Sequence, residues 1–125
     1  MKIGHFRDLK IWQRSMSLAS SIYTLTARFP QSETFGLVQQ MRRASVSIPS
    51  NIAEGHSRPT EKSFALFLSQ ARGSLNELET QLELSIQLGL AEKRECSGTL
   101  REIDEIARML SAFVAVLQKP PSRPR

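Results

Sequence analysis

Residues 60–89 read TEKSFALFLSQARGSLNELETQLELSIQLG, and apolar residues recur in this stretch at intervals of three and four positions. Such spacing collects apolar side chains on one face of an α-helix, which has 3.6 residues per turn. Thr60 can cap the first turn with its hydroxyl, and Gly89 is a residue type that often ends a helix. We predict a helix from about 60 to 88 whose core-facing stripe is Phe64, Leu68, Ala71, Leu75, Leu78 and Leu82.

Three other stretches show the same spacing, and no stretch alternates with the period of two that is typical of strands. They predict helices over about 8–28, 32–55 and 92–118. Because the connections between the four helices have only a few residues, successive helices must run antiparallel. The predicted fold is an all-α, up-down-up-down four-helix bundle over residues 1–118, followed by a flexible Pro/Arg-rich tail over 119–125.

The first helix carries more apolar surface than one core contact uses. It has two stripes at helical spacing, one of Leu9, Trp12, Met16, Ala19 and Tyr23, and one of Ile11, Leu18, Ile22, Leu25 and Phe29. A helix packed on one side of a core buries a single stripe. We therefore expect copies of the chain to associate and cover the remainder.

The second helix has a core stripe of Val38, Met41, Ser45, Ile48 and Ile52, interrupted by a proline. Pro49 lacks an N–H group and its ring meets the carbonyl of Ser45, so we expect a kink there. Polar neighbours offer hydrogen bonds to the freed backbone, and a glycine follows as a helix stop. We interpret this segment as a structural motif that shapes a subunit contact, with a ligand site as the alternative; its residues are Ser47, Pro49, Asn51, Glu54 and Gly55.

Three segments give the chain a family resemblance. They are FRDLKIW at 6–12, FGLVQQMRRASVSIPSNIAEG at 35–55 and GSLNELETQLE at 73–83. The chain closely resembles the four-helix-bundle proteins encoded in intervening sequences of bacterial 23S rRNA genes, also called the S23 family. Coverage runs from about residue 6 to 90, and the middle segment is the most specific.

The resemblance implies a bundle that assembles into a ring, a pentamer, similar to the accessory variability proteins of diversity-generating retroelements. Those relatives present a basic surface to nucleic acid and to a reverse transcriptase. The resemblance brings no catalytic residue and no cofactor.

The charge of +5 is unevenly distributed along the chain. Residues 1–72 have a net charge of +6, residues 73–118 a net charge of −4, and the last seven residues a charge of +3. Basic surfaces attract polyanions such as RNA or DNA, although an excess of this size also occurs in proteins that bind neither. The positive half and the tail are where we expect an anion to bind.

Seven basic residues are the candidates for nucleic-acid binding. Three share one face of the first helix, two are adjacent in the second helix, and two flank the turn after it. A solvated face is an equal alternative for the first group, and the adjacent pair can instead anchor Glu54 or a neighbouring subunit. We assign five aromatic residues, Trp12, Tyr23, Phe29, Phe64 and Phe67, to core stripes, so we expect binding to be electrostatic and weakly specific. The candidates are Arg7, Lys10, Arg14, Arg42, Arg43, Arg58 and Lys62.

The residues that usually carry chemistry are sparse. With two histidines, one cysteine and no metal-ligand spacing, the sequence predicts neither an enzyme nor a metal or cofactor site. We expect Cys96, which falls on a core stripe, to be buried and inert, and His56, in the turn after Gly55, to be a capping or surface residue and not a ligand. Salt bridges between the third and fourth helices are expected to join Glu77, Glu79 and Glu83 to Arg94, Arg101 and Arg108.

No apolar run is long enough to span a bilayer, and a lone cysteine allows no internal disulfide, so we expect no membrane association and a cytoplasmic location. The leading hypothesis is a homo-oligomer that pools basic charge to bind RNA or DNA. The alternative is an adaptor that binds another protein through exposed apolar surface.

Overall fold

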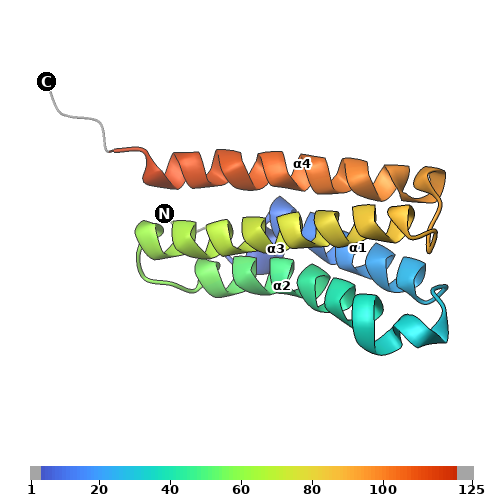
Figure 1. The fold of residues 1–125 in the computed structure, drawn as a ribbon. Helices are drawn as coiled ribbons and strands as arrows, with labels where there is room; N and C mark the ends of the chain where they lie inside the picture. The colour runs from blue at the N-terminus through green and yellow to red at the C-terminus, as the bar shows by residue number, and fades with distance from the viewer. Residues whose placement is uncertain (1–3, 121–125) are drawn as a thin grey trace, which may run out of the picture.

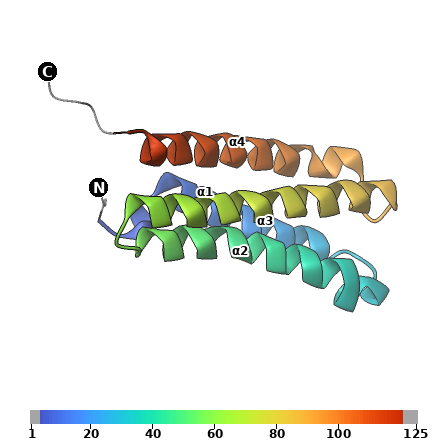
Figure 2. The same ribbon diagram turned by 60° about the vertical axis from the view of Figure 1, so that its left-hand side comes forward.

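The computed structural model describes residues 4–120 and shows four long helices packed side by side. Helices α1 and α3 run in one direction and α2 and α4 in the other (Figure 1). In both views α2 and α4 lie on opposite sides of the bundle (Figures 1 and 2). The predicted all-α four-helix bundle is therefore confirmed. Its elements are η1 (Phe6–Asp8), α1 (Lys10–Thr26), η2 (Gln31–Glu33), η3 (Thr34–Val38), α2 (Gln39–His56), α3 (Glu61–Gln87) and α4 (Lys93–Gln118).

Local signals set the ends of α3 and α4 where the sequence predicts them. The hydroxyl of Thr60 accepts a hydrogen bond of 3.0 Å from the backbone N–H of Ser63, in the first turn of α3. Gly89, with a φ of 77°, adopts the left-handed conformation that follows many helix ends. At the start of α4, the carboxylate of Glu95 accepts a bond of 2.9 Å from the N–H of Glu92.

The start of the second helix differs from the prediction. A 3-10 turn and then a π-helical turn, Thr34–Val38, precede α2 in place of a regular helix from residue 32. Within that turn Gly36 has φ −107° and ψ −110°, which lie outside the helical region. Helix α2 itself runs unbroken through Pro49. The described break in helical geometry is thus at Gly36, thirteen positions before the proline where we expected a kink.

Gly55 does not stop α2, and that prediction was wrong. The helix continues to His56, and within residues 4–120 a positive φ occurs at Gly4 and Gly89 but not at Gly55. A Cβ atom at Gly55 would lie 2.7 Å from Cβ of Phe67 and 2.9 Å from Cδ1 of Phe64. The glycine therefore lets α2 approach α3 closely.

The core lies along the predicted stripes of α2 and α3, whose members are all buried. On α1 the structure separates the two apolar stripes. Ile11, Leu18 and Ile22 are buried in the core, whereas Met16 and Tyr23 are 46% and 43% exposed. One stripe thus closes the bundle, and much of the other remains at the surface.

Among residues 4–120, we find no helix with the length and apolar character needed to cross a membrane. The predicted domain boundary at residue 118 coincides with the end of α4, while most of the predicted tail lies outside the described residues.

Candidate nucleic-acid interface

The topology divides the seven predicted basic residues into separate groups. Arg7 lies in η1 and Lys10 at the start of α1, and Arg58 and Lys62 flank the turn between α2 and α3. Because α1 and α2 are antiparallel, these four positions fall toward the same end of the bundle (Figure 1). Arg42 and Arg43 lie in the first turn of α2, toward the opposite end. The predicted residues therefore do not form one continuous patch on a single copy.

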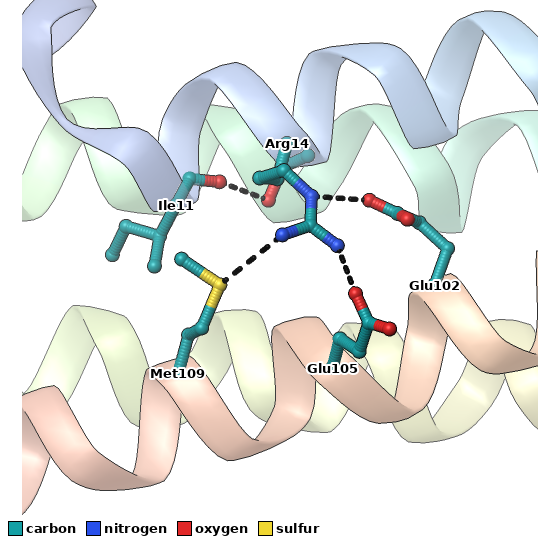
Figure 3. Close-up of polar contacts among 6 residues, drawn as sticks. Ile11, Arg14, Glu102, Glu105 and Met109 are labelled. Atoms are coloured by element: carbon teal, nitrogen blue, oxygen red, sulfur yellow. Dashed lines mark hydrogen bonds and ion pairs between the residues drawn. The ribbon is translucent and has the colours of Figure 1, made fainter.

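Arg14 is engaged by two acidic residues of α4 (Figure 3). Its Nε atom lies 2.5 Å from Glu102 and its second terminal nitrogen 2.5 Å from Glu105, while Sδ of Met109 is 3.9 Å from the other nitrogen. The hydrogen bond to Glu102, then that to Glu105, raises the pKa of the guanidinium above its ordinary value. A phosphate would have to compete with both carboxylates, so we leave Arg14 out of the proposed nucleic-acid surface.

Just after the end of α1, Arg28 forms a third ion pair to α4, with Glu95. The hydrogen bond from the backbone of Glu92 lowers the pKa of the Glu95 carboxyl, and Arg28 lowers it further. We call the contact formed by Arg14, Arg28, Glu95, Glu102 and Glu105 the α1/α4 seam. It uses the acidic half of the sequence to neutralise cations of the basic half.

This seam replaces the predicted salt bridges between α3 and α4, and that prediction was wrong. Arg94 pairs with Glu92 at 3.2 Å and Arg108 with Asp104 at 3.1 Å, both within or beside their own helix. Within the described range, neither of these arginines nor Arg101 forms an ion pair with an acidic residue of α3. Apart from the local pair of Arg94 with Glu92, the ion pairs to α4 from elsewhere in the described residues come from α1 and from Arg28 just after it.

Arg58 is held in place beside the turn that follows α2. It forms an ion pair of 2.9 Å with Glu54, one helical turn earlier, and its guanidinium lies 4.7 Å from the centre of the Phe67 ring. Glu54 therefore pairs with Arg58 and not with the two arginines at the start of α2. By contrast, Arg7, Lys10 and Lys62 are exposed, and nothing in the described part of the chain pairs with them.

Arg42 anchors α2 to the end of α1. Its Nε donates to Oγ1 of Thr26 at 2.9 Å, and a terminal nitrogen donates to the backbone carbonyl of Tyr23 at 3.2 Å. The guanidinium also lies 4.5 Å from the centre of the Tyr23 ring. Arg43, the next residue, is exposed and has no acidic partner between residues 4 and 120. The two adjacent arginines thus have different surroundings: Arg42 bonds to α1, whereas Arg43 faces solvent.

Beside these arginines lies an open pocket of about 400 Å³, which we call the Phe35 pocket. The Phe35 side chain is 89% exposed, and Tyr23, which was expected on a core stripe, is 43% exposed. The sequence analysis did not single out Phe35, which lies in the π-helical turn directly before Gly36. The pocket is lined by Tyr23, Thr34, Phe35, Val38, Gln39, Arg42 and Arg43.

The polar residues of the predicted motif connect α2 internally and to α3. The amide nitrogen of Asn51 donates to the carbonyl oxygen of Ser47 at 2.8 Å and to its hydroxyl at 3.0 Å. That hydroxyl also lies 2.9 Å from the hydroxyl of Ser74 on α3. Pro49 is buried and faces α1. The motif therefore contributes to helix packing through the Asn51 bonds within α2 and the Ser47 contact with α3.

A larger depression of about 500 Å³ runs between α1 and α2, and we call it the α1/α2 groove. Its ten described lining residues carry no charge, and Met16, Tyr23 and Val46 are each more than 40% exposed. The exposed stripe of α1 forms one wall. The groove is lined by Phe6, Trp12, Met16, Ala19, Ser20, Tyr23, Val46, Pro49, Ser50 and Ala53.

The side chains that most often carry chemistry are either buried or far from one another in the described part of the chain. Cys96 is fully buried, as predicted, and burial raises the pKa of its thiol. His56 is buried against the edge of Phe64, with ring centres 6.0 Å apart, so its assignment to a surface turn was wrong. In the described region, histidine, cysteine, aspartate and glutamate side chains form no cluster suited to a metal ion.

Comparison with known protein families identifies the family of this chain. The family model described as 23S rRNA-intervening sequence protein matches residues 7–112, most of the chain. The chain belongs to this family. The match extends the resemblance into α4, as far as residue 112, which the sequence segments alone did not cover.

A solved relative from Bacteroides thetaiotaomicron VPI-5482 has the same fold. It is a protein of unknown function from the S23 ribosomal protein family, 23% identical, with a TM-score of 0.75. The similarity covers 83% of this chain and 97% of that one. A search of curated proteins found no match to this chain.

Proposed function

We propose that this chain is a non-enzymatic homo-oligomer, a ring of five copies, that binds RNA or DNA through pooled basic charge. The observation that carries the proposal is the α1/α2 groove. A single copy leaves this uncharged surface open to water, although covering a large apolar side chain contributes about 1.5–3 kcal/mol. A second copy of the chain would cover it.

The basic residues support a polyanionic ligand. Arg7, Lys10, Arg43 and Lys62 are exposed and unpaired within the described range, so their charges are available to phosphates. They lie toward both ends of a single bundle, which limits the contact that one copy can make. In a ring of five copies at +5 each, the total charge is +25, and simultaneous contacts raise the overall affinity.

The family adds circumstantial support. Its name refers to intervening sequences of 23S rRNA, which is a statement about where such proteins are encoded. The number of copies and the link to retroelement accessory proteins come from the resemblance of the sequence segments. They belong to the proposal.

A filter-binding titration against labelled RNA and DNA at two salt concentrations tests the charge component. Between about 50 and 200 mM salt we expect affinity to fall at least about 10-fold, because each phosphate contact releases counterions. Replacing both Lys10 and Lys62 with glutamine should weaken binding and reduce the salt dependence. Arg94→Gln, which removes an exposed charge outside the candidate set, is the matched control.

Affinity that does not change with salt would contradict phosphate contacts. Absence of nucleic-acid binding together with stoichiometric co-purification of a defined protein, such as a reverse transcriptase, would favour the adaptor function instead.

A further inference from the structure

The Phe35 pocket combines features that the charge-based proposal does not use. Phe35 is 89% exposed, and the Tyr23 ring beside the pocket is 43% exposed. Single exposed aromatic residues are common on protein surfaces, so exposure alone indicates nothing. Here, however, both rings line the same open pocket as two arginines. Aromatic rings next to cations are the elements with which proteins bind unpaired nucleotides.

The backbone holds Phe35 away from the core. It lies in the π-helical turn Thr34–Val38, directly before Gly36 and its non-helical dihedral angles. A π turn adds a residue to the helical repeat, so side chains before it are rotated relative to those after it. Leu37 and Val38 are consequently buried while Phe35 faces solvent. Such turns occur frequently at functional sites.

The electrostatics of the pocket favour an anion. None of its seven described lining residues is acidic, and Glu33 lies beside Gly36, outside the lining. Arg42 is fixed by its bonds to Thr26 and to the Tyr23 carbonyl, so it contributes a positioned positive charge. Arg43 is exposed and has no partner of opposite charge in the described chain, which leaves its guanidinium available to a phosphate.

We propose that the Phe35 pocket binds an unpaired nucleotide of a single-stranded nucleic acid. The Phe35 ring stacks on the base, Arg43 binds the adjacent phosphate, and the side chains of Thr34 and Gln39 face the polar edge of the base. The inference rests on the proposed nucleic-acid function and specifies the form of the ligand. In a duplex the faces of the bases are covered by their neighbours, so the pocket selects single strands.

Fluorescence anisotropy of the full chain tests this with one labelled oligonucleotide, used alone and annealed to its complement. Wild type should bind the single strand more tightly. Phe35→Leu keeps an apolar side chain but removes the stacking surface, and should weaken single-strand binding about 5- to 150-fold while duplex binding changes little. Val116→Ala, at another exposed apolar residue at the end of α4, should change neither affinity.

Arg43→Gln and Lys62→Gln remove the same charge from different places. We expect Arg43→Gln to weaken the single strand more than the duplex, and Lys62→Gln to weaken both alike. The mass of each variant, measured by light scattering, should equal that of wild type.

The outcomes separate the two proposals. If wild type binds both forms equally and Phe35→Leu has no effect, the pocket assignment is overturned and charge-based binding stands. If wild type binds neither form, both proposals fail. If Phe35→Leu lowers the mass of the assembly, Phe35 is a contact between copies, and the assignment is again overturned.

Discussion

Helix α1 contacts its two neighbours through edges of opposite chemistry. Toward α4 it presents Arg14, and Arg28 follows just after its end. The charges of both are matched by carboxylates of the same chain. Toward α2 it presents Trp12, Met16 and Tyr23, which line a groove that nothing in the described chain fills. The polar edge is satisfied within one copy and the apolar edge is not. In the proposed assembly, this difference makes the apolar edge the contact between copies.

The largest expected effect comes from placing a charge in the α1/α2 groove. Met16→Asp would bury a carboxylate at the contact between copies, and we expect the dissociation constant of the assembly to rise at least about 100-fold. The folding of a single chain should change by less than about 0.5 kcal/mol, because Met16 is 46% exposed there. Sedimentation velocity over a concentration series measures this.

Ser17→Asp is the matched control, since it adds the same charge to α1 on the side that faces α4. It should leave the mass unchanged. Equal dissociation by both variants would contradict the assignment of the groove as the contact.

The contact between α2 and α3 at Gly55 can be compared with both edges of α1. There the two helices pack closely, with neither a groove nor an ion pair between them in the described part of the chain. Gly55→Ala would place a Cβ atom 2.7 Å from Cβ of Phe67, and we expect a loss of about 1–3 kcal/mol in the free energy of unfolding. A urea titration measures the change.

Gly73→Ala should change the free energy of unfolding in the opposite direction to Gly55→Ala. This glycine is inside α3, and a Cβ atom added to it would meet nothing within 4 Å, so alanine should stabilise the chain by about 0.5–1 kcal/mol. Destabilisation of similar size by both substitutions would show that close approach is not what Gly55 provides.

A smaller loss of stability than at Gly55 is expected at the α1/α4 seam. Arg14→Met keeps much of the side-chain volume but leaves Glu102 and Glu105 without their shared cation, and we expect a loss of about 1 kcal/mol in low salt. The difference from wild type should shrink as salt is added, because screening weakens both the original attraction and the new repulsion.

Arg94→Met removes an arginine that is 86% exposed and should have almost no effect in the same urea titration. An Arg14→Met loss that does not respond to salt would mean that packing against Met109, not charge, holds this edge.

The sequence allowed the helices to be predicted because their signals are local. The spacing of apolar residues set the stripes of α2 and α3, and Thr60 and Gly89 set the limits of α3. Properties that depend on neighbouring helices leave no such local signal. Two apolar stripes on α1 were equally periodic, and which one entered the core depended on where α2 and α4 lie.

The candidate site was predicted less well for the same reason. A glycine near a helix end is consistent with both a stop and a close approach, and only the position of Phe67 distinguishes them at Gly55. Charge pairing depends on how each helix is rotated, so the partners of Arg14 could not be read from spacing. Phe35 was missed because a π turn shifts the register without a clear sequence signal beyond Gly36.

Static light scattering of dilute protein at moderate ionic strength tests the central claim most directly. If the α1/α2 groove is covered by further copies, the mass will be several times 14.1 kDa, and about 70 kDa for a ring of five. A constant mass of 14.1 kDa across the concentration range would show that one copy tolerates the open groove, and would contradict the account.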